Sequence, residues 1–394
     1  MSYSNKLSDN VYWVGVNDRE TDFFENLWPL PYGISYNSYL IVDEKVVLVD
    51  TVKIDYQERY LEKLMDLTDG RPIDYLVINH MEPDHSGSIK ELMRLFPDMK
   101  IIGNNKTTGF LKGFYGITEN IKEVDNEETL DIGEKTLKFF ITPMVHWPET
   151  MMTYLEEENI LFSGDVFGAF GAINQSIFDD EIETDFFEDE IIRYYSNIVG
   201  KYSPIAAKHI GSLGDLEIDT VASTHGPVWR ENPDYIINKY YDMAKFKADK
   251  GAVVIYGTMY GNTKKIAEEA AAGLSAAGVK DVKLYDASRT HESYLISDIW
   301  KYKGVIFASC SYNNELFPPV NSLVEALENR GIQNRYFGFI GTYSWSGGSL
   351  ERMNQFAEDC NIEVVEPKIN NQYAPTADNL EKAFKLGKNV GEKI

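Results

Sequence analysis

The order of strand-like and helix-like segments in this chain of 394 residues predicts an α/β protein built from two domains. A chain of this length is too long for one ordinary hydrophobic core, so it is expected to divide. The alternating pattern begins again near Gly251, after a charged helical stretch at 232–250. We therefore predict one domain at residues 1–249 and a second domain at residues 250–394.

In the first domain, short β-rich runs alternate with helical patterns, which is typical of layered α/β folds. The expected helices span 56–69 and 86–96. The expected strands span 38–42, 46–49, 75–78, 137–141, 151–154, 160–162 and 220–223. Most of these strands stop just before a His, an Asp or a turn that contains Gly, so their ends present polar side chains.

The second domain repeats the order strand, helix, strand, helix. Its first strand, at 252–256, is followed by a Gly-rich turn and a helix at 264–276. Further strands are expected at 282–285, 305–309, 336–341 and 362–365, with a closing helix at 377–393. This order predicts a doubly wound parallel sheet.

The composition excludes several classes of partner and site. A formal net charge of −24 at pH 7 argues against nucleic acid and anionic membranes, which would repel such a surface. The N-terminal sequence lacks a signal-peptide pattern, and no long apolar run occurs, so we expect a cytoplasmic protein without a membrane span. Cys310 and Cys360 form no C-x-x-C pair, which excludes a disulfide framework, a zinc ribbon and an iron–sulfur cluster.

The most informative cluster in the sequence lies at 80–85, shortly after the expected strand at 75–78. It contains four potential metal ligands: His80, Glu82, Asp84 and His85. Such groups would repel and desolvate one another on one turn unless a cation compensated them. A solvated acidic loop would not need two imidazoles, so the cluster favours a metal site.

Three further candidate ligands follow at other strand ends: His146, Asp165 and His225. A single His or Asp at the end of a strand is more often a capping or hydrogen-bonded residue than a ligand. Their occurrence together with the cluster at 80–85 is therefore what carries the argument.

The order of these seven residues resembles the metallo-β-lactamase superfamily, which implies an αββα sandwich for the first domain. The usual hydrolase signature is His-x-His-x-Asp-His, and Glu82 stands here in place of the second His, as in the flavodiiron branch. A carboxylate adds charge and hard oxygen donors, which shifts the metal preference from zinc towards iron. The resemblance implies two iron ions joined by an oxo or hydroxo bridge, one held by His80, Glu82 and His146, the other by Asp84, His85 and His225, with Asp165 between them.

Other residues near these motifs are candidates for supporting roles. Tyr195 is a candidate catalytic residue, although an aromatic on a helical face is more often plain core. Trp147 and Glu149 are candidates to support the metal ligands. The segment 25–32 differs from relatives that carry a His near Glu25, so the resemblance leaves the lining of the substrate pocket open there.

The second domain opens with a Thr- and Gly-rich turn between a buried strand and a helix, a place suited to a phosphate. The turn has neither the spacing of a Walker A loop nor that of a G-x-G-x-x-G motif. Two later turns, at 309–314 and 341–348, lie where a doubly wound sheet collects its ligand. Taken singly, each is only a tight connection between a strand and a helix.

Together the three turns resemble the flavodoxin pattern, which implies bound FMN. The Tyr and Trp side chains of the later turns can sandwich the isoalloxazine ring, and Cys310 is expected to be a small packing residue. The residues implied in FMN binding are Thr258, Met259, Tyr260, Gly261, Asn262 and Thr263 in the first turn, Ser309, Cys310, Ser311, Tyr312, Asn313 and Asn314 in the second, and Thr342, Tyr343, Ser344, Trp345 and Gly347 in the third.

The two domains together resemble flavodiiron proteins over essentially the whole chain. The resemblance implies an oxidoreductase that passes electrons from FMN to the iron pair and reduces O2 to water or NO to N2O, a detoxification typical of anaerobic metabolism. It also implies an external electron donor such as rubredoxin or a reduced deazaflavin. A head-to-tail homodimer, or a dimer of such dimers, would bring the FMN of one subunit to the irons of the other.

Two other functions fit parts of the sequence. A zinc hydrolase with an accessory flavodoxin domain would use the metal to lower the pKa of a bound water, and Glu82 argues against it. A pure electron-transfer flavoprotein would keep seven ligand positions without any chemistry. Between O2 and NO the sequence does not choose.

Overall fold

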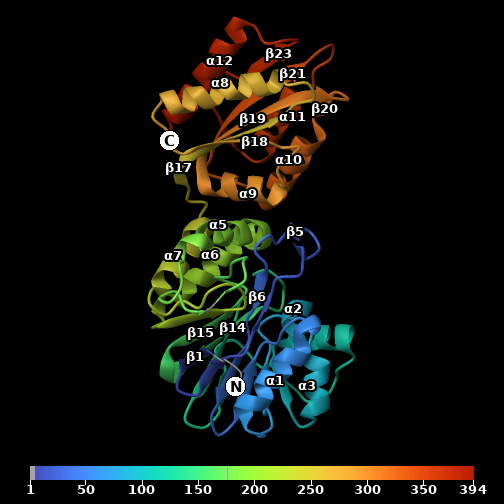
Figure 1. Cartoon of the computed structure of the whole chain (residues 1–394), viewed down its shortest axis with the longest axis vertical. Helices are drawn as coiled ribbons and strands as arrows, with labels where there is room; N and C mark the ends of the chain where they lie inside the picture. The colour runs from blue at the N-terminus through green and yellow to red at the C-terminus, as the bar shows by residue number, and fades with distance from the viewer. Residues whose placement is uncertain (1–4, 175) are drawn as a thin grey trace. The chain divides into compact units, whose positions relative to one another are not determined.

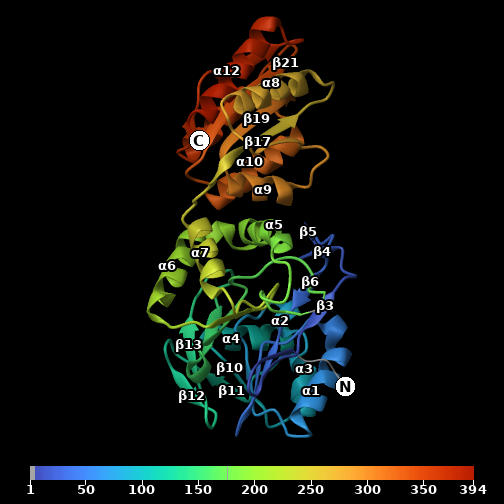
Figure 2. The same ribbon diagram turned by 60° about the vertical axis from the view of Figure 1, so that its left-hand side comes forward.

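The computed structural model describes residues 5–174 and 176–394, and the chain divides into two compact units between Tyr241 and Asp242 (Figures 1 and 2). The segment after the division packs with the second unit, since the carbonyl oxygen of Phe246 accepts a hydrogen bond from Arg335 Nη1 at 2.8 Å. None of the helices in the described ranges has the length and apolar character that a membrane span requires.

Two β-sheets form the centre of the first unit. The larger has the order β1-β2-β7-β8-β9-β10-β11 and the smaller β12-β13-β14-β15-β16. Tyr39 joins them, because its ring lies 5.1 Å from that of Phe162 and its hydroxyl donates to the carbonyl oxygen of Ser223 at 2.6 Å. The strands are β1 Asn5–Ser8, β2 Val11–Trp13, β7 Tyr39–Val42, β8 Val46–Val49, β9 Tyr75–Val77, β10 Lys100–Gly103, β11 Ile121–Glu123, β12 Thr129–Asp131, β13 Thr136–Ile141, β14 Met151–Leu155, β15 Ile160–Gly164 and β16 Thr220–Ser223.

Helices flank this pair of sheets, which gives the αββα arrangement that was expected. In both ribbon views α1 (Gln57–Thr68) and α3 (Ile89–Leu95) lie on one flank, and α6 (Ser203–Ser212) and α7 (Pro233–Ala244) lie on the other (Figures 1 and 2). The helix α5 (Asp185–Tyr194) and two small antiparallel pairs complete the unit: β3 (Val16–Asp18) with β6 (Ile34–Tyr36), and β4 (Phe23–Phe24) with β5 (Trp28–Pro29).

The helix predicted at 86–96 differs in the structure, where α2 (Pro83–Ser86) precedes α3 and the two are separated at Gly87. A Cβ atom on Gly87 would lie 2.7 Å from both the Ile54 nitrogen and the Pro83 carbonyl oxygen. The missing side chain therefore lets α2 approach the backbone at Ile54 closely.

The second unit is a parallel sheet of order β18-β17-β19-β21-β22, the doubly wound arrangement that was predicted. A further strand, β23, pairs in parallel with β21 and lies beyond the last strand that the sequence predicted. The elements are β17 Asp249–Gly257, α8 Asn262–Ala276, β18 Val282–Asp286, α9 Glu292–Lys301, β19 Tyr302–Tyr312, β20 Glu315–Leu316, α10 Pro318–Arg330, β21 Tyr336–Tyr343, α11 Ser349–Asp359, β22 Glu363–Val364, β23 Ile369–Gln372 and α12 Ala377–Gly391.

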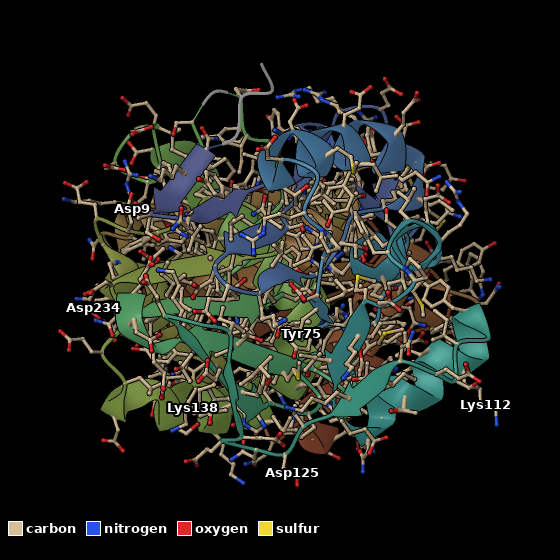
Figure 3. The ribbon with its side chains drawn as sticks, turned by 90° about the horizontal axis from the view of Figure 1, so that it is seen from below. Asp9, Tyr75, Lys112, Asp125, Lys138 and Asp234 are labelled. Carbon is tan, nitrogen blue, oxygen red and sulfur yellow. The ribbon has the colours of Figure 1, made fainter. Side chains whose placement is uncertain are left out.

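Burial separates apolar strands from charged surface in the first unit. All four residues of β8 are fully buried, as a strand in the middle of a covered sheet requires. Charged side chains project outward around the unit, and Lys112 and Asp125 in Figure 3 are examples.

Candidate functional site

The seven predicted metal ligands lie together in one buried cluster of the first unit, on turns that follow strands. The cluster at 80–85 follows β9, and His146 lies in the turn between β13 and β14. Asp165 and His225 follow the parallel neighbours β15 and β16, whose carboxyl ends meet at one edge of the sheet. Each of the seven residues is at most 8% exposed.

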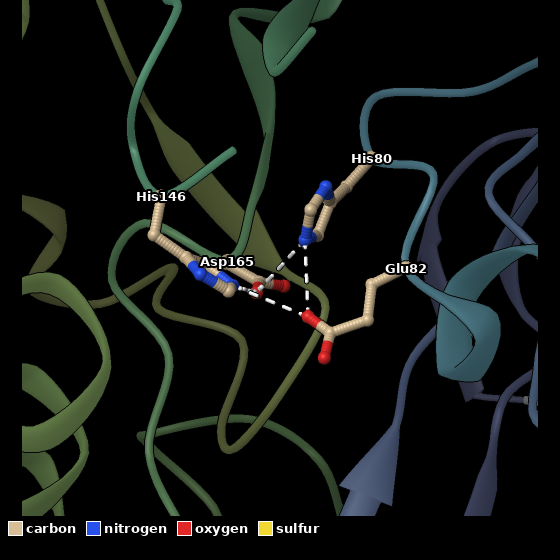
Figure 4. Close-up of side chains that lie close together, drawn as sticks. All are labelled: His80, Glu82, His146 and Asp165. Carbon is tan, nitrogen blue, oxygen red and sulfur yellow. Dashed lines mark hydrogen bonds and ion pairs between the residues drawn. The ribbon is translucent and has the colours of Figure 1, made fainter. Parts of the chain in front are cut away.

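Four of these residues form a first half-site, drawn in Figure 4. The Nε2 atoms of His80 and His146 each lie 3.2 Å from Oε2 of Glu82. The same His146 nitrogen lies 3.2 Å from Oδ2 of Asp165, and the His80 nitrogen lies 3.7 Å from it. One atom from each residue can therefore reach a common centre, since these atoms all lie within 4.8 Å of one another.

The remaining residues form a second half-site beside the first. His85 Nε2 lies 2.9 Å from Oδ1 of Asp165 and 3.3 Å from Oδ2 of Asp84. His225 Nε2 lies 3.5 Å from Oδ2 of Asp84 and 3.7 Å from Oδ1 of Asp165. Asp165 thus turns one carboxylate oxygen to each half-site, which is the geometry of a bridging ligand.

Buried atoms without a hydrogen bond in this cluster test whether cations fit it. Within the described residues, both oxygens of Asp84, both ring nitrogens of His85 and Nε2 of His225 make no hydrogen bond although they are buried. Buried polar atoms normally have partners, so five such atoms in one place need another explanation. Metal ions at the two half-sites would serve these atoms, and a set of imidazoles and carboxylates suits iron.

Residues around the cluster fix which nitrogen of two of the imidazoles, His80 and His225, faces it. His80 Nδ1 lies 2.8 Å from Oε1 of Glu149, which is fully buried, and His225 Nδ1 lies 2.7 Å from the carbonyl oxygen of Ser35. These bonds leave both Nε2 atoms for a metal. The sequence indicated Glu149 but gave no signal for Ser35, whose contribution is a backbone atom.

The turn that carries His80 is fixed by a second carboxylate that sequence reasoning missed. Oδ1 of Asp50 accepts hydrogen bonds from the backbone nitrogens of Asn79 at 2.8 Å and His80 at 3.3 Å. Burial raises the pKa of Asp50 to about 6. Its position at the end of β8 was the available signal, because other strand ends in this unit also carry functional side chains.

The structure places Tyr194, at the end of α5, and Tyr195, at the start of the following π-helical turn, differently from what was expected. The hydroxyl of Tyr195 lies 2.8 Å from Oγ of Ser203, and its ring packs against Tyr240. Tyr194 instead packs its ring 5.5 Å from that of His225, and its buried hydroxyl has no hydrogen-bond partner within the described residues. The position of Tyr195 therefore does not support the role expected of it, and Tyr194 is the better candidate.

A cavity of about 270 Å³ opens in the second unit at the carboxyl ends of β17, β19 and β21. Its position is the one that the three predicted turns indicated. Predicted residues that line it are Thr258, Met259, Tyr260, Asn262, Thr263, Cys310, Ser311, Asn313, Asn314, Thr342, Tyr343, Ser344 and Trp345. Burial raises the pKa of Cys310, which agrees with a packing role rather than a reactive one.

Four predicted flavin residues do not line this cavity: Gly261, Ser309, Tyr312 and Gly347. Gly261 begins α8 with φ 88°, and Ser309 Oγ accepts a hydrogen bond from the Phe317 nitrogen at 3.1 Å. Both residues therefore shape the backbone next to the cavity without lining it. Ser346 and Tyr373 line it and were not predicted. Tyr373 follows β23, so missing that strand meant missing the residue.

The donors of the cavity wall fit an FMN phosphate and ring. The first turn ends at the N-terminus of the 15-residue helix α8, which favours an anion. Thr263 Oγ1 lies 2.8 Å from Thr342 Oγ1 and joins the first turn to the third. Tyr260 and Trp345 are 92% and 89% exposed at the rim, where their faces are free to cover a planar ring.

Several acids and bases of the metal cluster hold protons near neutral pH when no metal is bound, which predicts a pH effect on metal loading. Burial raises the pKa of Asp84 to about 7. Burial alone would lower the pKa of His85 and His146, but neighbouring carboxylates raise each to about 9. Ligands must lose these protons, so metal affinity should rise with pH from about 6 to 9.

Calorimetric titration of the metal-free protein with Fe²⁺ under anaerobic conditions checks this expectation. Run at pH 7 in buffers with different ionisation enthalpies, it should show net proton release on binding. Equal heats in all buffers would contradict it.

Gly348 predicts a second effect, on flavin affinity. Its φ is 142°, and a Cβ atom there would lie 1.8 Å from the carbonyl oxygen of Asn314. Gly348→Ala should push the second and third turns apart and weaken FMN binding about tenfold. Fluorescence titration of the apoprotein with FMN measures the change. Gly347→Ala is the control, because a Cβ there would meet nothing closer than 3.9 Å, and equal losses in both variants would refute the explanation.

Comparison with protein families matches both units. The family described as ODP family beta lactamase matches residues 34–226, and the flavodoxin family matches residues 254–387. These matches agree with the two architectures seen in the structure.

Relatives and solved structures match the whole chain. The nitric oxide reductase of Moorella thermoacetica is 33% identical over 399 residues, which is 100% of both chains. The anaerobic nitric oxide reductase flavorubredoxin of Escherichia coli O1:K1 / APEC is 34% identical over 98% of this chain and 82% of its own. The rubredoxin oxygen:oxidoreductase of Desulfovibrio gigas has the same fold, with a TM-score of 0.94 and 28% identity over 99% of this chain and 98% of its own. So does the flavodiiron protein of Giardia intestinalis, with a TM-score of 0.94 and 28% identity over 100% of this chain and 97% of its own. With a two-metal cluster in one unit and a flavin cavity in the other, the chain belongs to the flavodiiron protein family.

Proposed function

We propose that this protein is a gas reductase that takes electrons through FMN to a non-haem di-iron site and reduces NO to N2O, O2 to water, or both. The observation that carries the proposal is Asp165, whose two carboxylate oxygens face two separate groups of ligands. Two metals that share this carboxylate would supply the redox chemistry for the reduction of a diatomic gas. The names of the relatives, nitric oxide reductase and oxygen oxidoreductase, support the same reaction class.

The proposal assigns roles to the residues of each unit. The first half-site would hold one iron and the second half-site the other, with Asp165 shared. The turns around the cavity of the second unit would hold FMN, with the phosphate at the start of α8. For the functional domains we keep the boundary that the sequence predicted, 249/250, which lies eight residues after the division of the structure into two compact units.

Electron supply, assembly and location form a further part of the proposal. The flavorubredoxin and rubredoxin oxygen:oxidoreductase relatives support a rubredoxin-type donor, and a reduced deazaflavin is the alternative. A head-to-tail homodimer would pair each flavin with the partner's irons, and the proposed site of action is the cytoplasm. Sedimentation of the active enzyme tests the assembly, because a fully active monomer would exclude it.

The chain's own residues have three tasks in such a reaction. When bound, FMN and the iron pair supply the redox chemistry, taking up electrons and reducing the gas. Glu149 and the Ser35 carbonyl hold two imidazoles with Nε2 towards the cluster. Thr224 Oγ1 donates to Oδ1 of Asp165 at 2.6 Å and fixes the bridging carboxylate.

Turnover of each gas is the direct test, with Glu82→His as the diagnostic variant. The reduced, iron-loaded enzyme should consume NO or O2, and the comparison of kcat/KM between the gases decides the preference. Glu82→His should lower iron retention and abolish gas consumption, because it exchanges a hard oxygen donor for an imidazole.

The exposed Glu119→His serves as the control for that variant. Two zinc ions per chain with hydrolase activity and no redox turnover would support the zinc hydrolase instead. Full FMN reduction without gas consumption would leave an electron-transfer protein.

The two tyrosines give a matched pair of variants. The Tyr194 hydroxyl has no hydrogen-bond partner in the part of the chain that the structure describes, so Tyr194→Phe should leave stability unchanged while kcat falls at least about tenfold from the loss of a donor beside the cluster. Tyr195→Phe breaks the hydrogen bond to Ser203, so it should cost about 1 kcal/mol of stability and leave kcat unchanged. Thermal unfolding and steady-state kinetics separate the two, and the reverse pattern would restore Tyr195 as the functional residue.

A further inference from the structure

The small hairpin of β4 and β5, residues 23–29, lies against the second half-site. The ring of Phe24 stands edge-on to that of His225, with 5.5 Å between the centroids. Phe24 is only 4% exposed, and its ring also meets Phe170 at 5.6 Å. The hairpin therefore supplies an apolar wall on the His225 side of the metal cluster.

This hairpin has little stability of its own. Its two strands form a separate two-stranded sheet, in which Phe23 pairs with Pro29 and Phe24 pairs with Trp28. A two-stranded hairpin alone is marginal in water. Its turn also places Glu25 at φ 50° and Asn26 at φ 58°, in the left-handed region that is unfavourable for residues other than Gly. The position of Phe24 must then be maintained by contacts from outside the hairpin.

Arg193 on α5 provides such a contact. Its side chain is 2% exposed, and Nη1 donates a hydrogen bond to the carbonyl oxygen of Pro29 at 3.0 Å. The guanidinium also lies over the Phe170 ring, 4.4 Å from the centroid, and Phe170 packs on Phe24. One cation thus holds both the second strand of the hairpin and the ring that supports its first strand.

The buried charge of Arg193 is compensated from the same helix. Nε and Nη2 donate to Oε2 of Glu190 at 3.0 and 2.6 Å, so the guanidinium is held in a fixed orientation. A planar fork with donors on several sides can satisfy a carboxylate, a carbonyl and an aromatic face together, which a lysine ammonium cannot. The task at this place is therefore specific to arginine.

We propose that Arg193 is a positioning residue for gas reduction: by holding the β4–β5 hairpin against α5, it keeps Phe24 over the His225 half of the cluster and so shapes the space in which the gas is reduced. This inference rests on the proposed function. It assigns an effect on how the gas is bound to a residue that contacts Glu190, Pro29 and Phe170.

The test compares Arg193→Lys with Arg230→Lys. Arg230 serves as the control, because it also pairs with a carboxylate, Asp180, through two hydrogen bonds of 2.9 Å and lies over a ring, Phe178, while its hydrogen bonds within the described residues do not reach the hairpin. For each iron- and FMN-loaded variant we would measure hydrogen–deuterium exchange of residues 22–30, iron content, and kcat and KM for NO and O2.

Arg193→Lys should speed exchange in residues 22–30 and lower kcat/KM for the gas about tenfold with iron content unchanged, since small misplacements near a reacting centre are costly. Arg230→Lys should change neither. Glu190→Gln, which keeps Arg193 and the shape of its partner, should give a weaker effect of the same kind and serves if Arg193→Lys does not fold.

Three outcomes would overturn the inference. Unchanged exchange in both Arg193→Lys and Glu190→Gln would show that the hairpin is held by other contacts. Faster exchange with unchanged kcat/KM would show that the hairpin does not shape the reaction, and loss of iron would show a role in the metal site itself. An inactive wild-type enzyme would refute the proposed function, whereas the exchange data would still decide whether Arg193 holds the hairpin.

Discussion

Crowding of acids and bases out of water is the constraint on which the rest of this structure depends. Three carboxylates and four imidazoles meet in a cluster whose members are at most 8% exposed. Burial of carboxylates is costly, and in the cluster without metal it raises the pKa of Asp84 to about 7, while His85 and His146 hold protons beside the other carboxylates. Two divalent cations with one hydroxide balance three carboxylates, so metal replaces protons as the compensating charge.

The fold meets this constraint by placing the metal ligands at the ends of hydrogen-bonded strands. The backbone at His80 is held by Asp50 at the end of one strand, and the ring of His80 is held by Glu149 from the opposite sheet. Asp165 and His225 follow neighbouring parallel strands. His80, Asp165 and His225 are therefore positioned by elements with their own hydrogen bonds, and not by the metal alone. Such preorganisation limits the strain that the site can impose on the surrounding sheets.

The parts of the site that could be predicted from the sequence share one property: the residues that identify them lie close together in the chain. The cluster at 80–85 is improbable as a loop without a cation, and the three flavin turns each follow a recognisable strand. Residues that act across the fold gave no such signal. Ser35 contributes a carbonyl oxygen, and Arg193 acts on a hairpin more than 160 positions away in the chain. Tyr373 was missed because β23 is short and half of its residues are exposed, so its pattern is weak.

The different positions of Tyr194 and Tyr195 show why the spacing of apolar residues in the sequence could not identify the tyrosine beside the metal cluster. An amphipathic helix reveals its inward face only if its other face is exposed, and every residue from Glu190 to Gly200 is buried. The α-helix α5 ends at Tyr194, and a π-helical turn begins at Tyr195, so the angular phase changes between the two residues. Which ring meets His225 is then decided by the aromatic neighbours Phe24 and Phe170, which come from distant segments. π-helical turns are frequent at functional sites, and here the turn directs one tyrosine to the metal cluster and its neighbour to the core.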